Sequence, residues 1–454
     1  MNIIVVGCGK IGRTIISSLV NENHDVLAID ENPEKIREVT NLYDVMGIVG
    51  SGTSYEKLTD AEAGKADLFI AVTNSDEINM LSCFAAKRMG AKNTVARIRD
   101  AENNGAISLE FMKNLLDISM AINPELMTAN AIYNLLKLPS ATKVETFSSH
   151  RFEMIELNLK EGSPLDGMTI VDLRKTSNEK FLICTVSRGD EVYVPQGNFK
   201  LKSGDKIGVI ASGHNTQKIL KTLGIVHKQV HDAMIMGAGK TSYYLAKMLL
   251  ESHIAVKVVE IKNEKCEEFC ESFPNAQVIC GNCMDQDLLI EEGINTTDAF
   301  VSLTGHDEEN ILISFYAMSQ NNDKVIAKVN GEELSSIAEK LGLDSIVSPK
   351  MLIADSLVQY ARALENSEGS KVETLYRLMN GRVEALEFNV LPDFEFIDVP
   401  VRDMHIRKDI IIAGIVRGTD TIIPSGADVI KAHDKVIVIA KGEKIYDLSS
   451  ILNH

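Results

Sequence analysis

The segment IIVVGCGKIGRTIISSL at residues 3–19 decides the fold, because three signals follow one another within it. The apolar run IIVV predicts a buried strand, the pattern Gly-x-Gly-x-x-Gly at residues 7–12 predicts a tight turn, and helical spacing of apolar residues follows. A second apolar run, HDVLAID at residues 24–30, ends in an acid. We therefore expect a strand, a glycine turn, a helix and a second strand that ends at Asp30.

The glycine turn has the chemistry of a dinucleotide-binding Rossmann domain. Gly7 permits the tight turn, Gly9 lets the backbone approach a pyrophosphate, and Gly12 lets the helix pack close to the sheet. The phosphates would lie against the free N–H groups at the helix N-terminus. Asp30 can accept hydrogen bonds from both ribose hydroxyls and would repel a 2′-phosphate, which favours NAD over NADP. The alternative is that Asp30 only caps the next helix.

The same pattern returns in AMIMGAGKTSYYLAKML at residues 233–249, and Glu260 ends the strand that follows. The letters GAGKTS look like the end of a P-loop, but a P-loop needs a glycine where this chain has Met234. Ser242 replaces the third glycine of the Rossmann pattern, and two bulky tyrosines follow it. The second turn is therefore either a second nucleotide site or a degenerate copy kept for packing.

Nearly the whole chain is one two-part module written twice, with an offset of about 230 residues. Matching residues recur in the same order along both halves: Gly7 with Gly237, Asp30 with Glu260, Thr73 with Thr304, Arg97 with Lys328, Arg188 with Arg417, Pro195 with Pro424, and Asp205 with Asp434. Chance does not readily maintain one offset through so many landmarks. A function assigned to the first half therefore has to be considered for the second half as well.

Each module predicts an α/β fold made of two domains. In its first part strands and helices alternate, and the strands are continuous apolar runs, which is typical of a parallel sheet covered on both faces. In its second part short strands alternate with Gly, Pro and Asp turns, which indicates a small α+β domain. The sequence therefore predicts tandem duplicated Rossmann-like domains, each followed by a small α+β domain, with boundaries at 1–140, 141–228, 229–368 and 369–454.

Two further loops at the expected carboxyl edge of the first sheet carry polar side chains. Thr73 and Asn74 follow the fourth strand and can reach the ribose or a phosphate. Alternatively, this loop only supplies Ser75 or Asp76 as the cap of the next helix. Arg97 ends the fifth strand and either offsets phosphate charge or forms a surface ion pair.

Composition excludes several classes of protein. Hydrophobic residues make up 45% of the chain, aromatic residues 5%, and Trp is absent, which fits a globular protein with an aliphatic core. The formal net charge of −17 argues against nucleic acid as a partner, because such binding needs clustered Lys and Arg. No apolar run approaches the ~18–20 residues that span a bilayer, and the N-terminal apolar run leads into glycines, so we expect a cytosolic protein.

The seven cysteines are widely spread and odd in number, which favours reduced thiols over a disulfide framework. The closest group is Cys266, Cys270, Cys280 and Cys283, and its Cys-Gly-Asn-Cys spacing is that of half a zinc site. Two of these cysteines should lie on a helix and another should end a strand. We therefore favour buried, inert thiols over a metal or redox role.

An enzyme has to be considered, because Rossmann sheets most often serve dehydrogenases. Hydride transfer needs a companion domain with an acid or base aimed at the nicotinamide. No His recurs between the paired β-rich stretches 184–211 and 413–440, and the recurring Arg188 and Arg417 each precede a Gly in a turn-like setting. The sequence therefore predicts a binding protein and not an enzyme. An NAD-dependent oxidoreductase with a duplicated Rossmann fold is the alternative.

The order of the motifs resembles one known family. VVGCGKIG, an ID acid, an IVGSGT turn and an AVTNSDE loop precede a bridging helix and a small domain with an RGD…VPQG pattern, and everything is doubled. Over essentially its full length the chain is similar to the TrkA family, the regulatory subunits of Trk potassium uptake systems. Members carry two RCK modules (regulators of potassium conductance). The resemblance implies a cytosolic protein that is attached to a membrane potassium translocator at the inner face of the membrane.

The resemblance also implies a homotetramer built as a ring of modules. Segments 125–138 and 350–364 are the candidate helices that cross between neighbours, although their apolar positions can instead pack within one chain. A regulator of another cation transporter, such as an efflux antiporter, is a further alternative.

Members of the family bind NAD or NADH, and also ATP or ADP, at the glycine loop, and this binding biases the translocator between open and closed. Carried onto this chain, the implied contacts are Gly7, Cys8, Gly9, Lys10, Ile11, Gly12, Asp30, Thr73, Asn74 and Arg97 in the first module, and Gly237, Ala238, Gly239, Lys240, Thr241, Glu260, Thr304 and Lys328 in the second. The departures at Ser242 and Lys328 leave the occupancy of the second site open.

Overall fold

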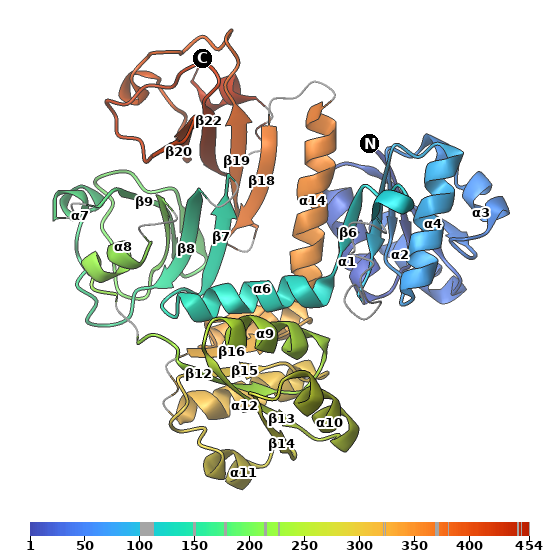
Figure 1. Cartoon of the computed structure of the whole chain (residues 1–454). Helices are drawn as coiled ribbons and strands as arrows, with labels where there is room; N and C mark the ends of the chain where they lie inside the picture. Colours follow the sequence, from blue (N-terminus) through green and yellow to red (C-terminus); the bar gives the residue numbers. More distant parts are fainter. Residues whose placement is uncertain are drawn as a thin grey trace. The chain divides into compact units, whose positions relative to one another are not determined.

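Figure 1 shows the computed structural model of the chain, which describes residues 1–99, 113–148, 151–176, 179–212, 216–225, 228–320, 322, 324–367, 372–379, 381–442, 445 and 447–453. The chain folds into two compact units. The first comprises Met1–Asn130, Val329–Gly331 and Ser348–Ala361, and the second comprises Ala131–Lys328, Glu332–Val347 and Arg362–His454.

The first Rossmann domain lies in the first unit and has a parallel six-stranded sheet in the order β3-β2-β1-β4-β5-β6. Its strands are β1 (Asn2–Val6), β2 (Asp25–Asp30), β3 (Met46–Val49), β4 (Leu68–Ala71), β5 (Asn93–Arg97) and β6 (Met120–Ile122). Its helices are α1 (Lys10–Asn21), α2 (Pro33–Tyr43), α3 (Tyr55–Asp60), the 3-10 turn η1 (Ala63–Lys65) and α4 (Asp76–Met89). The strand order reverses between β1 and β4, the place where open α/β sheets bind ligands.

The second Rossmann domain lies in the second unit and repeats this sheet as β14-β13-β12-β15-β16-β17, again with parallel neighbours. Its strands are β12 (Asp232–Met236), β13 (Ala255–Glu260), β14 (Gln277–Cys280), β15 (Ala299–Ser302), β16 (Lys324–Lys328) and β17 (Ile346–Val347). Its helices are α9 (Lys240–Glu251), α10 (Asn263–Ser272), α11 (Gln286–Glu291), α12 (Asp307–Ser319) and α13 (Glu332–Lys340).

Two small domains with antiparallel five-stranded sheets complete the second unit, in the orders β10-β9-β11-β8-β7 and β18-β19-β22-β20-β21. The first contains β7 (Lys143–Phe147), β8 (Phe152–Asn158), α7 (Ile170–Thr176), β9 (Phe181–Arg188), β10 (Glu191–Tyr193), β11 (Lys206–Ser212) and α8 (Thr216–Thr222). The second contains β18 (Val372–Leu378), β19 (Val383–Asn389), η2 (Val401–Asp403), β20 (Ile410–Arg417), β21 (Asp420–Ile422), β22 (Lys435–Lys441) and η3 (Leu448–Ile451). The predicted fold class is therefore confirmed, while the predicted domain boundaries stay predictions.

The small domains share one hydrophobic core. Its buried side chains come from both copies and include Phe147, Phe152, Leu378, Val383 and Ile437. The Phe147 ring meets the Tyr376 ring edge to face, with centroids 4.3 Å apart. The two sheets are thus partners in burying apolar surface, which neither covers alone.

The recurring arginines of the small domains are structural. The Arg188 guanidinium donates two hydrogen bonds, of 2.7 and 2.8 Å, to the carboxylate of the buried Asp205. Arg417 grips Asp434 in the same way at 3.0 and 2.7 Å. Because each guanidinium also donates to a backbone carbonyl, the pair fastens a turn to the sheet and explains why both residues recur in the two halves.

Two bridging helices, α6 (Pro124–Lys137) and α14 (Pro349–Ser367), join the Rossmann domains to the small domains. Each runs from one unit into the other. Tyr360 of α14 is hydrogen-bonded to Ser119 of the first unit. Near the other end of α6, the Tyr133 hydroxyl lies 2.5 Å from the Ser252 hydroxyl of the second Rossmann domain. Part of each bridging helix therefore contacts the Rossmann domain of the other half of the chain.

Across the described part of the chain, no helix combines the length and the apolar character that crossing a membrane requires.

Candidate nucleotide-binding sites

The first glycine turn leaves open space at the N-terminus of α1. Gly7 has a φ of +100°, and a Cβ there would lie 2.9 Å from the Thr73 nitrogen. A Cβ on Gly12 would lie 1.8 Å from the Gly7 carbonyl oxygen, so glycine is required at both places. A Cβ on Gly9 would meet no atom of the described residues within 4 Å. Because Gly9 precedes α1 and no side chain caps that helix, the first N–H groups of α1 are suited to bind a phosphate.

Asp30 lies at the end of β2 and fastens the glycine turn. One carboxylate oxygen accepts the Cys8 N–H at 2.7 Å, and the other accepts the Asn32 N–H at 2.9 Å. The cap of α2 is Asn32, whose side chain accepts from the Glu34 N–H at 2.8 Å. The alternative role of Asp30 as a mere helix cap is therefore wrong. Each carboxylate oxygen keeps acceptor capacity for a sugar hydroxyl.

Cys8 contributes to this turn through its backbone alone. Its thiol is buried and lies 3.9 Å from the Ile29 carbonyl oxygen. Burial, and secondarily the Asp30 charge, raises the pKa of the Cys8 thiol to about 12. Neighbouring Lys10 is exposed and Ile11 is half-buried at the start of α1, so the lysine is the side chain of this loop with the freedom to reach a ligand.

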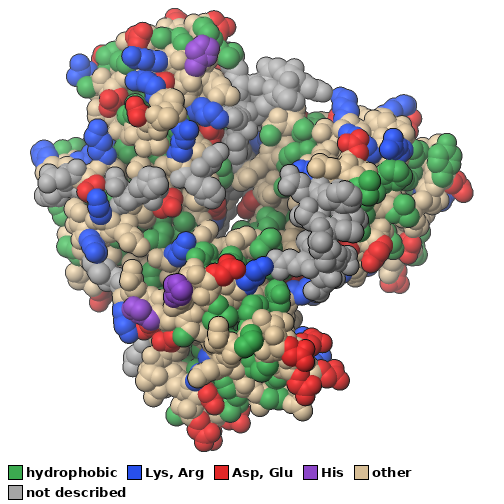
Figure 2. Space-filling model, in the orientation of Figure 1, with side chains coloured by type: hydrophobic (Ala, Val, Ile, Leu, Met, Phe, Trp, Pro, Cys, Tyr) green, Lys and Arg blue, Asp and Glu red, His purple; other side chains and the backbone are tan. Residues whose placement is uncertain are grey.

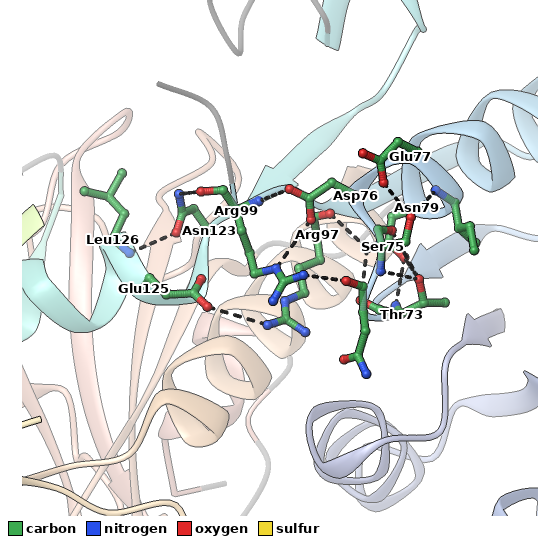
Figure 3. A network of polar contacts seen from close by, with 12 residues as sticks. Thr73, Ser75, Asp76, Glu77, Asn79, Arg97, Arg99, Asn123, Glu125 and Leu126 are labelled. Carbon is green, nitrogen blue, oxygen red and sulfur yellow. Dashed lines mark hydrogen bonds and ion pairs between the residues drawn. The ribbon is translucent and has the colours of Figure 1, made fainter. Parts of the chain in front are cut away.

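The loop after β4 is organised by a buried amide, Asn79 (Figure 3). Its carbonyl oxygen accepts both the N–H and the hydroxyl of Thr73 at 2.7 Å. Its amide nitrogen donates to the Thr73 carbonyl at 3.2 Å and to the Arg97 carbonyl at 3.0 Å. Asn79 therefore holds the carboxyl ends of β4 and β5 together. Reasoning from the sequence missed this residue, although Asn310 occupies the matching position in the second half.

The same loop caps α4 and exposes Asn74. Ser75 is the cap, because its hydroxyl accepts the Ile78 N–H at 3.2 Å. The Asn74 carbonyl accepts a hydrogen bond from the Arg99 guanidinium, and the Arg99 N–H donates to Asp76 at 2.7 Å. The Asn74 residue itself is exposed. Both expected roles of the loop, helix capping and presentation of polar groups, are therefore compatible in this structure.

Arg97 is a buried cation and not part of a surface ion pair. Its guanidinium lies 3.6 Å from the Glu125 carboxylate at the start of α6, and only 8% of the residue is exposed (Figure 3). Burial lowers the pKa of Arg97 from its usual value. Within the described residues its Nε finds no hydrogen-bond acceptor. The alternative of a surface ion pair is thus corrected to a buried pair, which ties the sheet edge to the bridging helix, while the role of Arg97 toward a phosphate stays a prediction.

The glycine turn at 237–242, with the strand ends beside it, is called the second cleft, and it repeats the frame of the first cleft, which is the turn at 7–12 with its strand ends. Gly237 has a φ of +95°, and a Cβ on Gly239 would again meet no described atom within 4 Å. Glu260 accepts the Ala238 N–H at 2.9 Å and the Lys262 N–H at 3.0 Å, as Asp30 does in the first cleft. The Thr304 N–H and hydroxyl donate to Asn310 at 2.9 and 2.8 Å.

The second half accommodates Ser242 and Lys328, which replace Gly12 and Arg97 of the first half. The Ser242 hydroxyl donates to the Gly237 carbonyl at 2.5 Å, so a hydrogen bond replaces the close approach that Gly12 makes. The Tyr243 ring packs on Phe273 next to α10, with centroids 4.8 Å apart. Thr241 is buried, Lys240 is exposed, and the Lys328 ammonium lies 3.3 Å from the Leu303 carbonyl. The second turn therefore keeps the backbone frame of the first, and both alternatives, a second nucleotide site and a copy kept for packing, stay predictions.

Comparisons with known proteins match both halves of the chain. The model of the TrkA-N domain matches residues 3–124 and 233–349, and that of the TrkA-C domain matches residues 154–224 and 385–453. The chain belongs to the TrkA family. A Trk system potassium uptake protein TrkA homolog from Archaeoglobus fulgidus is 32% identical over 99% of this chain and 100% of the relative. The Trk system potassium uptake protein TrkA of Vibrio alginolyticus is 28% identical over 98% of this chain and 96% of its own.

Solved structures share the fold of this TrkA family member. The GsuK channel bound to NAD has a TM-score of 0.62 at 16% identity, covering 97% of this chain and 76% of that chain. The GsuK RCK domain has the same TM-score and identity, and 92% of that chain is covered. The TrkA relatives are named as potassium uptake proteins and not as enzymes, so the oxidoreductase alternative finds no support among them.

Proposed function

We propose that this chain is the nucleotide-sensing regulatory subunit of a Trk-type potassium uptake system. It binds NAD or NADH, or ATP or ADP, in the first cleft and performs no chemistry on them. It assembles as a homotetramer on the inner face of the membrane and gates a membrane potassium translocator. Membership of the TrkA family supports the potassium role, and the NAD of the GsuK structure, which has the same fold, supports the choice of nucleotide.

The observation that carries the proposal is the acid that fastens each glycine turn. Asp30 and Glu260 each accept one backbone N–H from the turn and one from the residue two positions beyond the acid. A ribose bound to the same carboxylate would join ligand, turn and strand into one unit. The phosphates would then meet the uncapped N–H groups of α1 or α9.

A series of side-chain contacts connects the first cleft to the bridging helix α6. Thr73 at its rim is held by Asn79, which also holds the end of β5 where Arg97 sits. Arg97 in turn pairs with Glu125, in the first turn of α6. Because α6 continues into the second unit, we place the transmission of nucleotide occupancy at this first turn. Gating requires the nucleotide to bind the two states of the assembly unequally, since equal affinities would shift nothing.

The test is calorimetric titration of the purified chain with NAD, NADH, ATP and ADP, alongside Asp30→Ala and Glu260→Ala. Loss of a charged hydrogen-bond partner should weaken the bound nucleotide by about 10-fold to 100-fold. Glu31→Ala and Glu264→Ala remove neighbouring exposed carboxylates and should leave affinity unchanged. If neither acid matters to any nucleotide, both clefts are wrongly assigned. Turnover of NAD with a carbonyl or amine substrate would favour the oxidoreductase.

A further inference from the structure

Two thiols of the second Rossmann domain lie next to Glu260, the acid that fastens its glycine turn. Cys266 belongs to the first turn of α10, and Cys280 is the last residue of β14, opposite Glu260 in the strand register. The Cys280 thiol is close enough to the Cys266 thiol to help raise the pKa of Cys266, after burial, which is the larger cause. The Cys266 thiol also lies 3.4 Å from the Glu260 carbonyl oxygen, as its hydrogen-bond donor.

The pair combines an accessible thiol with a protected one. Cys280 is exposed, and its thiol donates to the Asn263 side-chain oxygen at 2.6 Å. Cys266 is buried, and burial raises the pKa of its thiol to about 11. Since the thiolate is the nucleophile, Cys280 is the residue that reacts first with an external reagent and Cys266 the one that reacts second.

A metal site does not account for these residues. Throughout the described ranges, no three or more His, Cys, Asp or Glu side chains come together in a way that could hold a metal ion. The described residues therefore give Cys280 and Cys283 no further ligands with which to complete a zinc site. Two thiols held at one corner of the domain, one by the Glu260 carbonyl and the other by Asn263 of α10, instead have the arrangement that two-electron thiol chemistry needs.

The first Rossmann domain lacks the pair and so serves as an internal control. In the same registers it has Ile36 on α2 and Val49 at the end of β3, opposite Asp30. Both positions therefore carry thiols only beside Glu260. The frame of the two clefts does not require sulfur, because the first cleft builds it with aliphatic side chains.

We propose that Cys266 and Cys280 form a reversible disulfide with a small neutral or cationic disulfide as the oxidant. The Cys280 thiolate attacks one sulfur of the reagent, forms a mixed disulfide and releases one thiolate. The Cys266 thiol then loses its proton and attacks the Cys280 sulfur, which releases the second thiolate. The two protons from the cysteines convert the released thiolates to thiols, so one disulfide is reduced as the other forms.

Charge around the pair selects the reagent. Figure 2 shows acidic side chains gathered over α10, whose exposed residues include Glu264, Glu267, Glu268 and Glu271. An anionic disulfide such as glutathione disulfide would approach against this field, whereas a cationic one such as cystamine would be attracted. The difference should shrink as salt is added.

The disulfide would alter the second nucleotide cleft, a step that rests on the proposed function. It removes the thiol hydrogen bond to the Glu260 carbonyl, and Glu260 is the residue that holds the Ala238 N–H of the glycine turn. We expect the affinity of the second cleft to fall about twofold to threefold, the low end for one neutral hydrogen bond, because a thiol is a weak donor. The first cleft should keep its affinity.

The test is to treat the full-length chain with cystamine or glutathione disulfide, block the remaining thiols and map the peptides without reduction. We expect a Cys266–Cys280 linked peptide that disappears with dithiothreitol and forms faster with cystamine. Cys270→Ser, which removes an exposed thiol from the same helix, should still form the link. Cys280→Ser, at an exposed position, should abolish it without disturbing the core.

The outcomes separate this inference from the proposed function. A buried Cys266 that stays alkylatable only after unfolding, with cystamine confined to Cys270 or Cys280, would overturn the thiol pair whatever the nucleotide does. Faster linkage with glutathione disulfide would overturn the choice of reagent. A linked peptide in a chain that binds no nucleotide would leave the thiol pair standing and remove the proposed function. A linked chain that still binds nucleotide with unchanged affinity would overturn the coupling between them.

Discussion

The two Rossmann domains share a backbone frame and differ in the side chains around it. Both have an acid that fastens the glycine turn and an asparagine that joins two strand ends. They differ at three equivalent positions. Gly12 corresponds to Ser242, Arg97 corresponds to Lys328, and aliphatic side chains of the first domain correspond to thiols of the second. The comparison teaches that the hydrogen bonds that shape the clefts are held in common. What differs is how each cleft connects to its surroundings.

The largest expected effect is at the third position of the glycine turn. Gly12→Ala would put a Cβ against the Gly7 carbonyl oxygen, a backbone atom that cannot move aside. We expect the free energy of unfolding to fall by about 3 kcal/mol, the upper range for overpacking, together with nucleotide binding at the first cleft. Ser242→Ala loses one hydrogen bond and should cost about 1 kcal/mol. Chemical unfolding of both variants measures the difference, and equal costs would mean that the two turns do not differ as described.

A smaller effect should be the same in both halves. Asn79→Ala leaves the polar backbone groups of Thr73 and Arg97 without their buried partner, and Asn310→Ala does the same for Thr304 and Lys328. Each substitution should lower the free energy of unfolding by about 2–3 kcal/mol. Asn74→Ala, at an exposed position, should change it by less than about 0.5 kcal/mol. A much smaller loss in free energy of unfolding for Asn310→Ala would show that the asparagine hydrogen bonds stabilise only the first half.

The smallest effect distinguishes the halves by pH. Lys324 of β16 is buried, donates to Ala141 and Ser345 at 2.5 and 2.9 Å, and has Asn93 as its counterpart in the first half. Burial lowers the pKa of the Lys324 ammonium from 10.5 to about 7, with partial compensation from Asp344. The unfolded chain therefore keeps this proton at pH values where the folded chain has released it. The folded state should gain up to about 1.4 kcal/mol per pH unit above pH 7, until the unfolded value is reached.

Unfolding of Lys324→Met between pH 7 and pH 9 checks this sign. The slope of stability against pH should be lower in the variant than in the unaltered chain. Lys65→Met, which removes an exposed lysine, should keep the original slope. A slope that Lys324→Met leaves unchanged would mean that Lys324 does not titrate in this range.

The sequence was sufficient to predict the features that follow from local pattern. Gly7 and Asp30 lie where they were expected, because a strand, a turn and the next parallel strand bring them to one sheet edge. Asn79 was missed, since an asparagine on a helix has no distinctive pattern until its side chain is placed. The burial of Arg97 was missed for a related reason, because it depends on packing by α6. The direction of the Tyr243 ring likewise depends on Phe273, which lies on another segment.

The undivided core of the two small domains has a consequence for the origin of the chain. A protein with only one module would expose to water the face that the other copy now covers. Such a protein could bury that face only by binding a second molecule of itself, with aromatic rings in edge-to-face contact across the interface. In this single polypeptide the contact between the two copies is internal, so its formation does not depend on protein concentration. A substitution in either cleft leaves this shared core in place.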